Sequence, residues 1–304
     1  MSVRGDALRA VIDIGSNSVL LLMGRVGRDG GVHVVDDIAT VTRLSQGVGS
    51  SGRFAEDAVS RTLRTLAGYR TQIETAGASL CVAAATEGVR MAADSRAFLA
   101  AAEEVLGQPV RVLSGEDEAE LSYQSIAVEH PSQALHVLDV GGASTELAFG
   151  VGMKVRQRSS VPVGSVRLTE RYMRGDPPTF EELSAVEAAA REALTKVALP
   201  PTTVLYGLAG TVTTAAALML GLEAYDRARV DNTRFSRSQV SALRAMLATE
   251  TLATRCARPC LPPGRADVII AGLTIVQLAM EHLGADTLIC RDRGHRYALL
   301  ARST

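Results

Sequence analysis

Two segments of this chain place an aspartate at the end of an apolar run and follow it with glycine and hydroxyl side chains. They are VIDIGSNSVLLL (11–22) and VLDVGGASTELAF (137–149), and they share one layout. Each predicts a β-hairpin whose polar turn carries the acid at its mouth. Backbone N–H groups and hydroxyls in such a turn form a nest for an anion. One copy alone would be an ordinary hairpin, but two copies facing each other across a cleft would hold a phosphate chain from both sides.

The candidate phosphate-binding residues are the small and polar residues of these two turns. They are Gly15, Ser16, Asn17 and Ser18 in the first turn, and Gly141, Gly142, Ala143, Ser144 and Thr145 in the second.

A second group of candidates lies in SGEDEAELSY (114–123) and ATEGVR (85–90). The first segment begins a helix with Ser114 as N-cap and adjacent acids behind it. Acids there favour the helix dipole, yet three in a row exceed that need, so one of them is a candidate general base. Arg90 follows a buried strand and is either a surface residue or a phosphate clamp.

Composition narrows the class of protein. The chain has 304 residues, 47% of them hydrophobic and 4% aromatic, with a net charge of −1. This suits two α/β domains and gives no sign of nucleic-acid binding. No apolar run reaches the roughly 20 residues needed to span a bilayer, and no signal segment is visible, so we expect a soluble, cytoplasmic protein. Cys256 and Cys260 lack a second pair for a zinc site, and the five scattered histidines are expected to be surface or packing residues.

The order of elements repeats along the chain. Strands are predicted at 8–14, 18–26, 31–38, 79–85 and 110–113, with helices at 56–75, 95–106 and 114–129. After the polar segment 129–133 the order restarts with strands at 135–140, 145–151, 154–161, 204–210 and 287–290. Helices are predicted at 211–220, 236–248, 265–282 and 294–302. We therefore expect two α/β domains, 1–130 and 131–304, with a cleft between them and the last helix packing back on the first domain.

The sequence gives no support for other common nucleotide-binding or catalytic motifs. GVGSSG (47–52) matches a dinucleotide-binding pattern, but no strong strand precedes it and no acid follows at the required distance, so we expect a flexible loop. The chain has no P-loop, no nucleophile elbow and no H-E-x-x-H. If the protein is an enzyme, carboxylates must carry the chemistry.

Together these segments resemble the exopolyphosphatase/guanosine pentaphosphate phosphatase (Ppx/GppA) family. DIGSNS (13–18) and DVGGASTEL (139–147) resemble its two phosphate loops, and ATEGVR and SGEDEAELSY its next two motifs. VPVGSVRLTERY (161–172), AGTVTT (209–214), RADVIIAG (265–272) and DRGHRYALL (292–300) follow in family order.

The resemblance implies a duplicated actin-like, sugar kinase and Hsp70 fold (ribonuclease H-like domains). It implies hydrolysis of a terminal phosphoanhydride of polyphosphate, of guanosine pentaphosphate (pppGpp), or of both, and hence a link to the stringent response. Glu118 aligns with the catalytic glutamate and Glu146 with a second essential one, joined by Asp139. Gly210 and Thr211 add substrate contacts. Asp13, Asp139 and Glu146 would hold Mg²⁺, or Mn²⁺ in its place.

The chain departs from the family pattern in three places. Ala143 stands where a third glycine is usual, Tyr297 stands where glutamate is common, and the chain stops before the C-terminal extension of longer members. The last departure puts a preference for very long polyphosphate in doubt. A homodimer, a kinase of the same fold and a sensor that binds without hydrolysing are left open.

Overall fold

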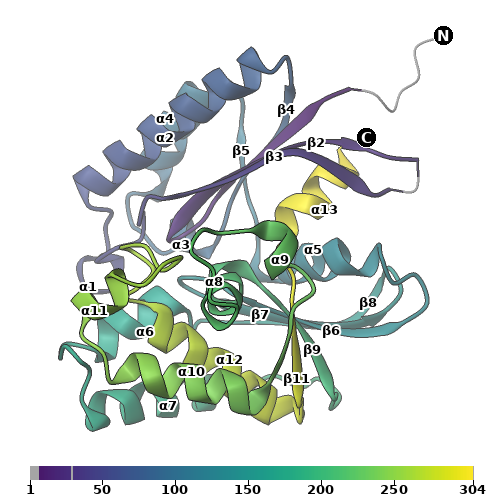
Figure 1. Ribbon diagram of the computed structural model, residues 1–304. Coiled ribbons are helices and arrows are strands. Elements are labelled where there is room, and N and C mark those ends of the chain that lie inside the picture. Colours follow the sequence, from purple (N-terminus) through teal and green to yellow (C-terminus); the bar gives the residue numbers. More distant parts are fainter. Residues whose placement is uncertain (1–6, 29, 304) are drawn as a thin grey trace.

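Two mixed β-sheets organise the chain in the computed structural model, which describes residues 7–28 and 30–303 (Figure 1). The first sheet has the order β3-β2-β1-β4-β5, and the second has the order β10-β11-β9-β6-β7-β8. The first comprises β1 (Arg9–Ile14), β2 (Ser18–Val26), β3 (Val32–Val41), β4 (Ser79–Ala85) and β5 (Val110–Val112). The second comprises β6 (Ala134–Val140), β7 (Thr145–Val151), β8 (Lys154–Val161), β9 (Val204–Leu208), β10 (Arg234–Ser236) and β11 (Thr287–Cys290).

Helices cover the outer face of each sheet, and two more lie between the sheets (Figure 1). On the first sheet the outer helices are α2 (Glu56–Thr75) and α4 (Ser95–Leu106), with α1 (Val48–Ser51) and α3 (Glu87–Arg90) as single turns. On the second they are α6 (Ser165–Tyr172), α7 (Phe180–Leu194), α8 (Ala209–Met219), α10 (Arg237–Ala248) and α12 (Ile269–Leu283), with α9 (Arg227–Val230) and α11 (Leu252–Cys256) as short pieces. The inner pair is α5 (Gly115–Ala127) and α13 (His295–Arg302).

Alternation along β1 decides which side chains face the space between the sheets. Ala10, Ile12 and Ile14 pack with α2 and α4 in the outer core. Val11 faces the other way, into a core built with α13. Because side chains alternate along a strand, Asp13 lies on the inner face with Val11.

The same rule applies to the second hairpin. Leu138, Val140 and Leu147 pack outward into the main core. Val137 and Ala148 pack inward against α5. Asp139 and Glu146 are directly opposite each other in the β6–β7 pairing, so both carboxylates lie on the inner face.

The start of α5 is fixed by a capping box. The Ser114 hydroxyl accepts from the backbone N–H of Asp117, and the Asp117 carboxylate accepts from the N–H of Ser114. The next residue, Glu118, is buried where the helix enters the space between the sheets. The cap therefore sets the position of this carboxylate.

Most of the expected elements are present, and several bounds agree to the residue, among them those of 56–75, 79–85, 95–106 and 145–151. The last helix packs on α5 and on β1 and β2. The prediction of a loop at GVGSSG (47–52) is wrong in part. Residues 48–51 form the helical turn α1, and the glycines on either side of it have left-handed backbone. The short elements α3, α9, α11 and β10 have no sequence signal strong enough to predict them. Within the described residues, no helix combines the length and apolarity required to cross a membrane.

Candidate active site

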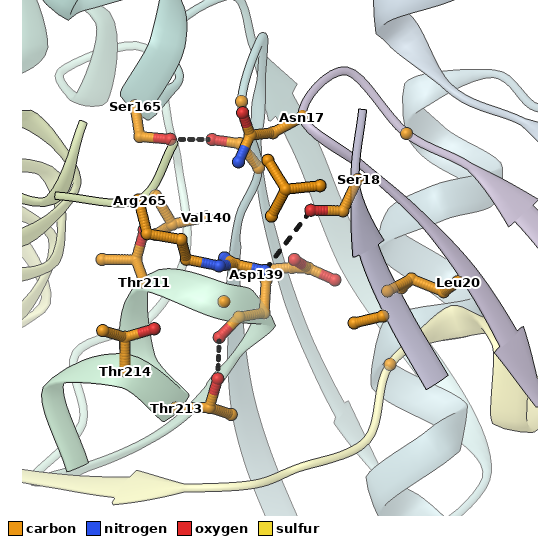
Figure 2. Close-up of a pocket in the computed structure, with 18 of the residues that line it drawn as sticks. Asn17, Ser18, Leu20, Asp139, Val140, Ser165, Thr211, Thr213, Thr214 and Arg265 are labelled. Atoms are coloured by element: carbon orange, nitrogen blue, oxygen red, sulfur yellow. Dashed lines mark hydrogen bonds between the residues drawn. The ribbon is translucent and has the colours of Figure 1, made fainter. Parts of the chain in front are cut away.

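A cavity of about 770 Å³ lies between the two sheets. Both hairpin turns line it, together with the start of α8, the turn before α12 and the start of α13. Figure 2 shows lining residues of the first turn, of α8 and of the turn before α12. Nearly every predicted site residue lies on its wall. Those present are Asp13, Gly15, Ser16, Asn17, Ser18, Glu118, Asp139, Gly141, Gly142, Ala143, Ser144, Glu146, Gly210 and Thr211.

The two turns have the same internal geometry. The N–H of Gly15 donates to the carbonyl of Ser18 at 3.0 Å, and the N–H of Gly141 donates to the carbonyl of Ser144 at the same distance. The turns also touch across the cleft, because a Cβ placed on Gly142 would lie 3.0 Å from the Ser16 Cβ. The prediction that they face each other is therefore confirmed.

Four carboxylates converge on the inner end of the cavity. Asp13, Asp139, Glu146 and Glu118 are each at most 9% exposed. The Ser122 hydroxyl donates to Asp139 Oδ2 at 2.6 Å, and the Ser160 hydroxyl donates to Glu146 Oε1 at 2.7 Å. Asp13 Oδ1 is buried without a hydrogen-bond partner. The cluster thus holds more negative charge than its polar neighbours satisfy.

Burial dominates the electrostatics of this cluster. It raises the pKa of Glu118, and repulsion by Glu146 raises that pKa further, while His295 and Arg90 act in the opposite direction. Burial also raises the pKa of Glu146, with Asp139 adding to the effect, and that of Asp139 itself. Carboxylates arranged in this way favour protonation or an added cation.

Two of the predicted residues lie outside the cavity wall. Arg90 lines a neighbouring groove that Ser144 also lines, and its Nη1 lies 3.6 Å from Glu118 Oε1. It is therefore adjacent to the carboxylate cluster and partly exposed. Thr145 is fully buried, and its hydroxyl donates to the carbonyl of Val163 at 2.7 Å, so this hydroxyl is not directed into the cleft.

His295 is a site residue that the sequence analysis missed. It was expected to be a surface or packing residue, but it lines the cleft with Nε2 at 2.9 Å from Asp13 Oδ2. Burial alone would lower its pKa, but Asp13, with Asp139 and Glu118 nearby, raises it to about 9. The contact joins residues that are far apart in the sequence, so no local motif could reveal it.

Arg265 is the second missed residue, noted before only as part of a family motif. It lies in the turn before α12, and its Nη2 is 3.4 Å from the Ser18 hydroxyl of the opposite turn (Figure 2). Burial lowers its pKa. Its guanidinium lies directly on Gly210, where a Cβ would be 1.3 Å from Nη1. It places a buried cation beside the first turn and against the start of α8.

The structure shows the surroundings of the two residues that the sequence analysis expects to depart from the family pattern, Ala143 and Tyr297. Ala143 is not among the described non-glycine residues with positive φ, so this position does not require a glycine backbone. The Tyr297 hydroxyl donates to Asp37 Oδ2 at 2.7 Å, and the ring lies against the guanidiniums of Arg227, Arg293 and Arg296. Tyr297 therefore supports three arginines that line the cavity.

The residues present suit a hard divalent cation by their chemistry. Asp13, Asp139 and Glu146 offer carboxylate oxygens, one of them buried without a partner. Among residues 7–28 and 30–303, however, no three His, Cys, Asp or Glu side chains are already arranged to hold a metal ion. One oxygen of Asp13 is instead in contact with His295.

Comparison with known proteins identifies one family for most of the chain. The sequence model of the Ppx/GppA phosphatase family matches residues 26–303. The chain is 36% identical over 287 residues to a protein named exopolyphosphatase 2 from Mycobacterium tuberculosis, and the match covers 90% of each chain.

Two solved structures are similar to this fold. The crystal structure of the Aquifex aeolicus member of the Ppx/GppA family is similar with a TM-score of 0.82 and 33% identity, over 97% of each chain. A solved exopolyphosphatase-like protein is similar with a TM-score of 0.89 and 28% identity, also over 97% of each chain. The likeness spans both sheets and confirms the two-sheet α/β fold expected from the family resemblance.

Proposed function

The chain belongs to the Ppx/GppA phosphatase family, and on that premise we propose that it hydrolyses a terminal phosphoanhydride bond. The substrate class is inorganic polyphosphate, guanosine pentaphosphate, or both. One observation carries the proposal: a buried glutamate, Glu118, faces a cleft formed by two matching phosphate-type turns.

The turns and the cations around them would bind the terminal phosphate. Backbone N–H groups and the hydroxyls of Ser16, Ser18 and Ser144 provide donors from both sides of the cleft. Arg265 lies beside the first turn and Arg90 beside the carboxylate cluster, so each can neutralise phosphate oxygens. Phosphoryl transfer through a loose transition state depends mainly on such positioning and neutralisation.

Glu118 would orient or deprotonate the attacking water. Its raised pKa makes it a stronger base than an exposed glutamate once it is ionised. Arg90 and His295 oppose the rise in the pKa of Glu118 by favouring its ionised form, although burial and Glu146 outweigh them.

Asp13, Asp139 and Glu146 would hold Mg²⁺ or Mn²⁺. Bound there, the ion would supply positive charge to the phosphate oxygens. Burial raises the pKa of Asp139 and of Glu146, and repulsion adds to it, from Asp13 at Asp139 and from Asp139 at Glu146. A bound cation would offset both effects, which supports this assignment.

The cavity is within the size range of small-molecule sites, and both substrates present the same terminal group to it. The test is phosphate release from polyphosphate and from guanosine pentaphosphate, measured in parallel with Mg²⁺. Release of orthophosphate from at least one substrate is expected. Binding of both without release would indicate a sensor, and transfer to an acceptor other than water would indicate a kinase.

A further inference from the structure

A second groove, of about 640 Å³, opens beside the carboxylate cluster, where the start of α5 meets β8. We call it the α5–β8 groove. Its lining includes two arginines and four serines, namely Arg90, Arg158, Ser114, Ser144, Ser159 and Ser160. Ser144 also lines the main cleft, so the two openings meet at the second phosphate-type turn. Guanidinium and hydroxyl donors in one groove suit a phosphate group.

The α5–β8 groove is on the side from which water would attack. Arg90 Nη1 lies 3.6 Å from Glu118 Oε1, so the groove adjoins the carboxylate that is proposed to orient the water. The attacking and leaving oxygens of a phosphoryl transfer are roughly in line. The leaving group must therefore point away from Glu118, into the main cleft, whose wall includes Arg258 and Arg265. The rest of the substrate then occupies the main cleft and leaves the groove free.

Arg158 brings a second guanidinium to this groove. It is opposite Ala148 in the β7–β8 pairing, and Ala148 packs inward against α5, so Arg158 is also on the α5 side of the strand. There its Nη2 lies 3.2 Å from Glu116, which also lines the groove, and its Nη1 is paired with Glu120. These ion pairs are partly exposed and therefore weak. Because a guanidinium has five N–H donors, a phosphate dianion can share Arg158 with these carboxylates or displace them.

We propose that the α5–β8 groove is an orthophosphate site through which the product leaves. Orthophosphate formed at the two turns has the shortened substrate on one side and this groove on the other, so it need not pass the substrate to reach solvent. Arg90 and Arg158 bind its oxygens, and Ser144 lies where the groove joins the cleft. The origin of the orthophosphate rests on the proposed function, whereas the site itself rests on the lining of the groove.

The first test is equilibrium dialysis of radiolabelled orthophosphate against the full chain, with a methylene-bridged triphosphate present to fill the main cleft without being hydrolysed. The wild type should still bind orthophosphate. Arg158→Gln should bind it about tenfold more weakly, the lower end of what a hydrogen bond to a charged group contributes, because Arg158 is partly exposed. Arg156→Gln is the matched control, because Arg156 is exposed on the same strand and is not part of the groove lining, and its binding should equal that of the wild type. Equal binding by all three proteins, or no orthophosphate binding, would overturn the proposal.

The second test is inhibition of polyphosphate hydrolysis by added orthophosphate in the wild-type protein, which does not depend on how a variant folds. Orthophosphate that enters by its own groove should inhibit noncompetitively with respect to polyphosphate. Purely competitive inhibition would mean that product and substrate use one opening, and the exit route would be wrong.

The inner phosphates of a polymer are the other source of phosphate for this groove. If they filled it, Arg158→Gln would raise KM more for long polyphosphate than for triphosphate, which would overturn the proposal. We expect the ratio of the two KM values to equal that of the wild type. A protein that hydrolyses neither substrate but binds orthophosphate through Arg158 would refute the proposed function and retain the orthophosphate site.

Discussion

Replacing Gly210 by alanine should prevent the Arg265 guanidinium from occupying its place in the cleft, although Arg265 itself is not mutated. A Cβ at position 210 would lie 1.3 Å from Arg265 Nη1, 2.1 Å from Cζ and 2.5 Å from Nη2. The whole guanidinium must therefore leave its place beside Ser18 and the start of α8. The backbone has no reason to move, because alanine is a better helix former than glycine and position 210 lies in α8.

The size of the effect follows from the contact that Arg265 would make. A hydrogen bond from a guanidinium to a charged group contributes about 1.5–3 kcal/mol, which corresponds to roughly 10- to 150-fold in kcat/KM. Gly210→Ala and Arg265→Ala should each lose this amount. The double variant should lose no more than Arg265→Ala, because it has no guanidinium to displace.

The assay is phosphate release by the wild type, the two single variants and the double variant. Gly68→Ala is the control, because it lies on the exposed face of α2 with nothing within 4 Å of the added Cβ. It should keep full activity and gain up to about 1 kcal/mol of stability. Losses that add in the double variant, or wild-type kcat/KM in Gly210→Ala, would refute the reasoning.

Three further predictions concern charge and cleft size. Arg90→Lys should lower kcat/KM nearly as much as Arg90→Ala, because a point charge cannot replace the bidentate fork, and equal kcat/KM in all three proteins would make Arg90 a bystander. The metal-free protein should unfold at lower temperature as pH rises toward about 9, because Glu118, Glu146 and His295 have raised pKa values and hold protons in the fold that the unfolded chain releases. A melting temperature in chelator that is flat or rises over that interval would contradict this. A cavity of about 770 Å³ holds only a short stretch of polymer, so a gel time course on long polyphosphate should show products of intermediate length, and their absence would mean processive action.

The sequence predicts those parts of the site that depend on residues close together in the chain. The two Asp-Gly turns, their hairpins and the capping box at Ser114 depend on residues within a few positions of each other. Period-two alternation puts Asp13 on the same strand face as Val11, and Asp139 on the same face as Val137. The packing of the whole fold shows that these faces are the inner ones.

The rest of the site depends on contacts between distant parts of the chain. His295 meets Asp13, and Arg265 meets Ser18, only because the two domains pack together. A histidine at a helix start and an arginine in a turn carry no pattern that distinguishes them from surface residues. The same limit applies to Thr145, whose hydroxyl is directed to Val163 by the packing of its neighbours.

The central claim is that Glu118 activates water at a phosphate held between the two turns. Its most direct test is steady-state hydrolysis by Glu118→Gln, with Glu116→Gln as control in the same helix turn, where the side chain is exposed and paired with Arg158. The account predicts that Glu118→Gln loses kcat by on the order of 100-fold or more while folding and substrate binding persist, and that Glu116→Gln stays near the wild type. Near wild-type kcat in Glu118→Gln would contradict the account.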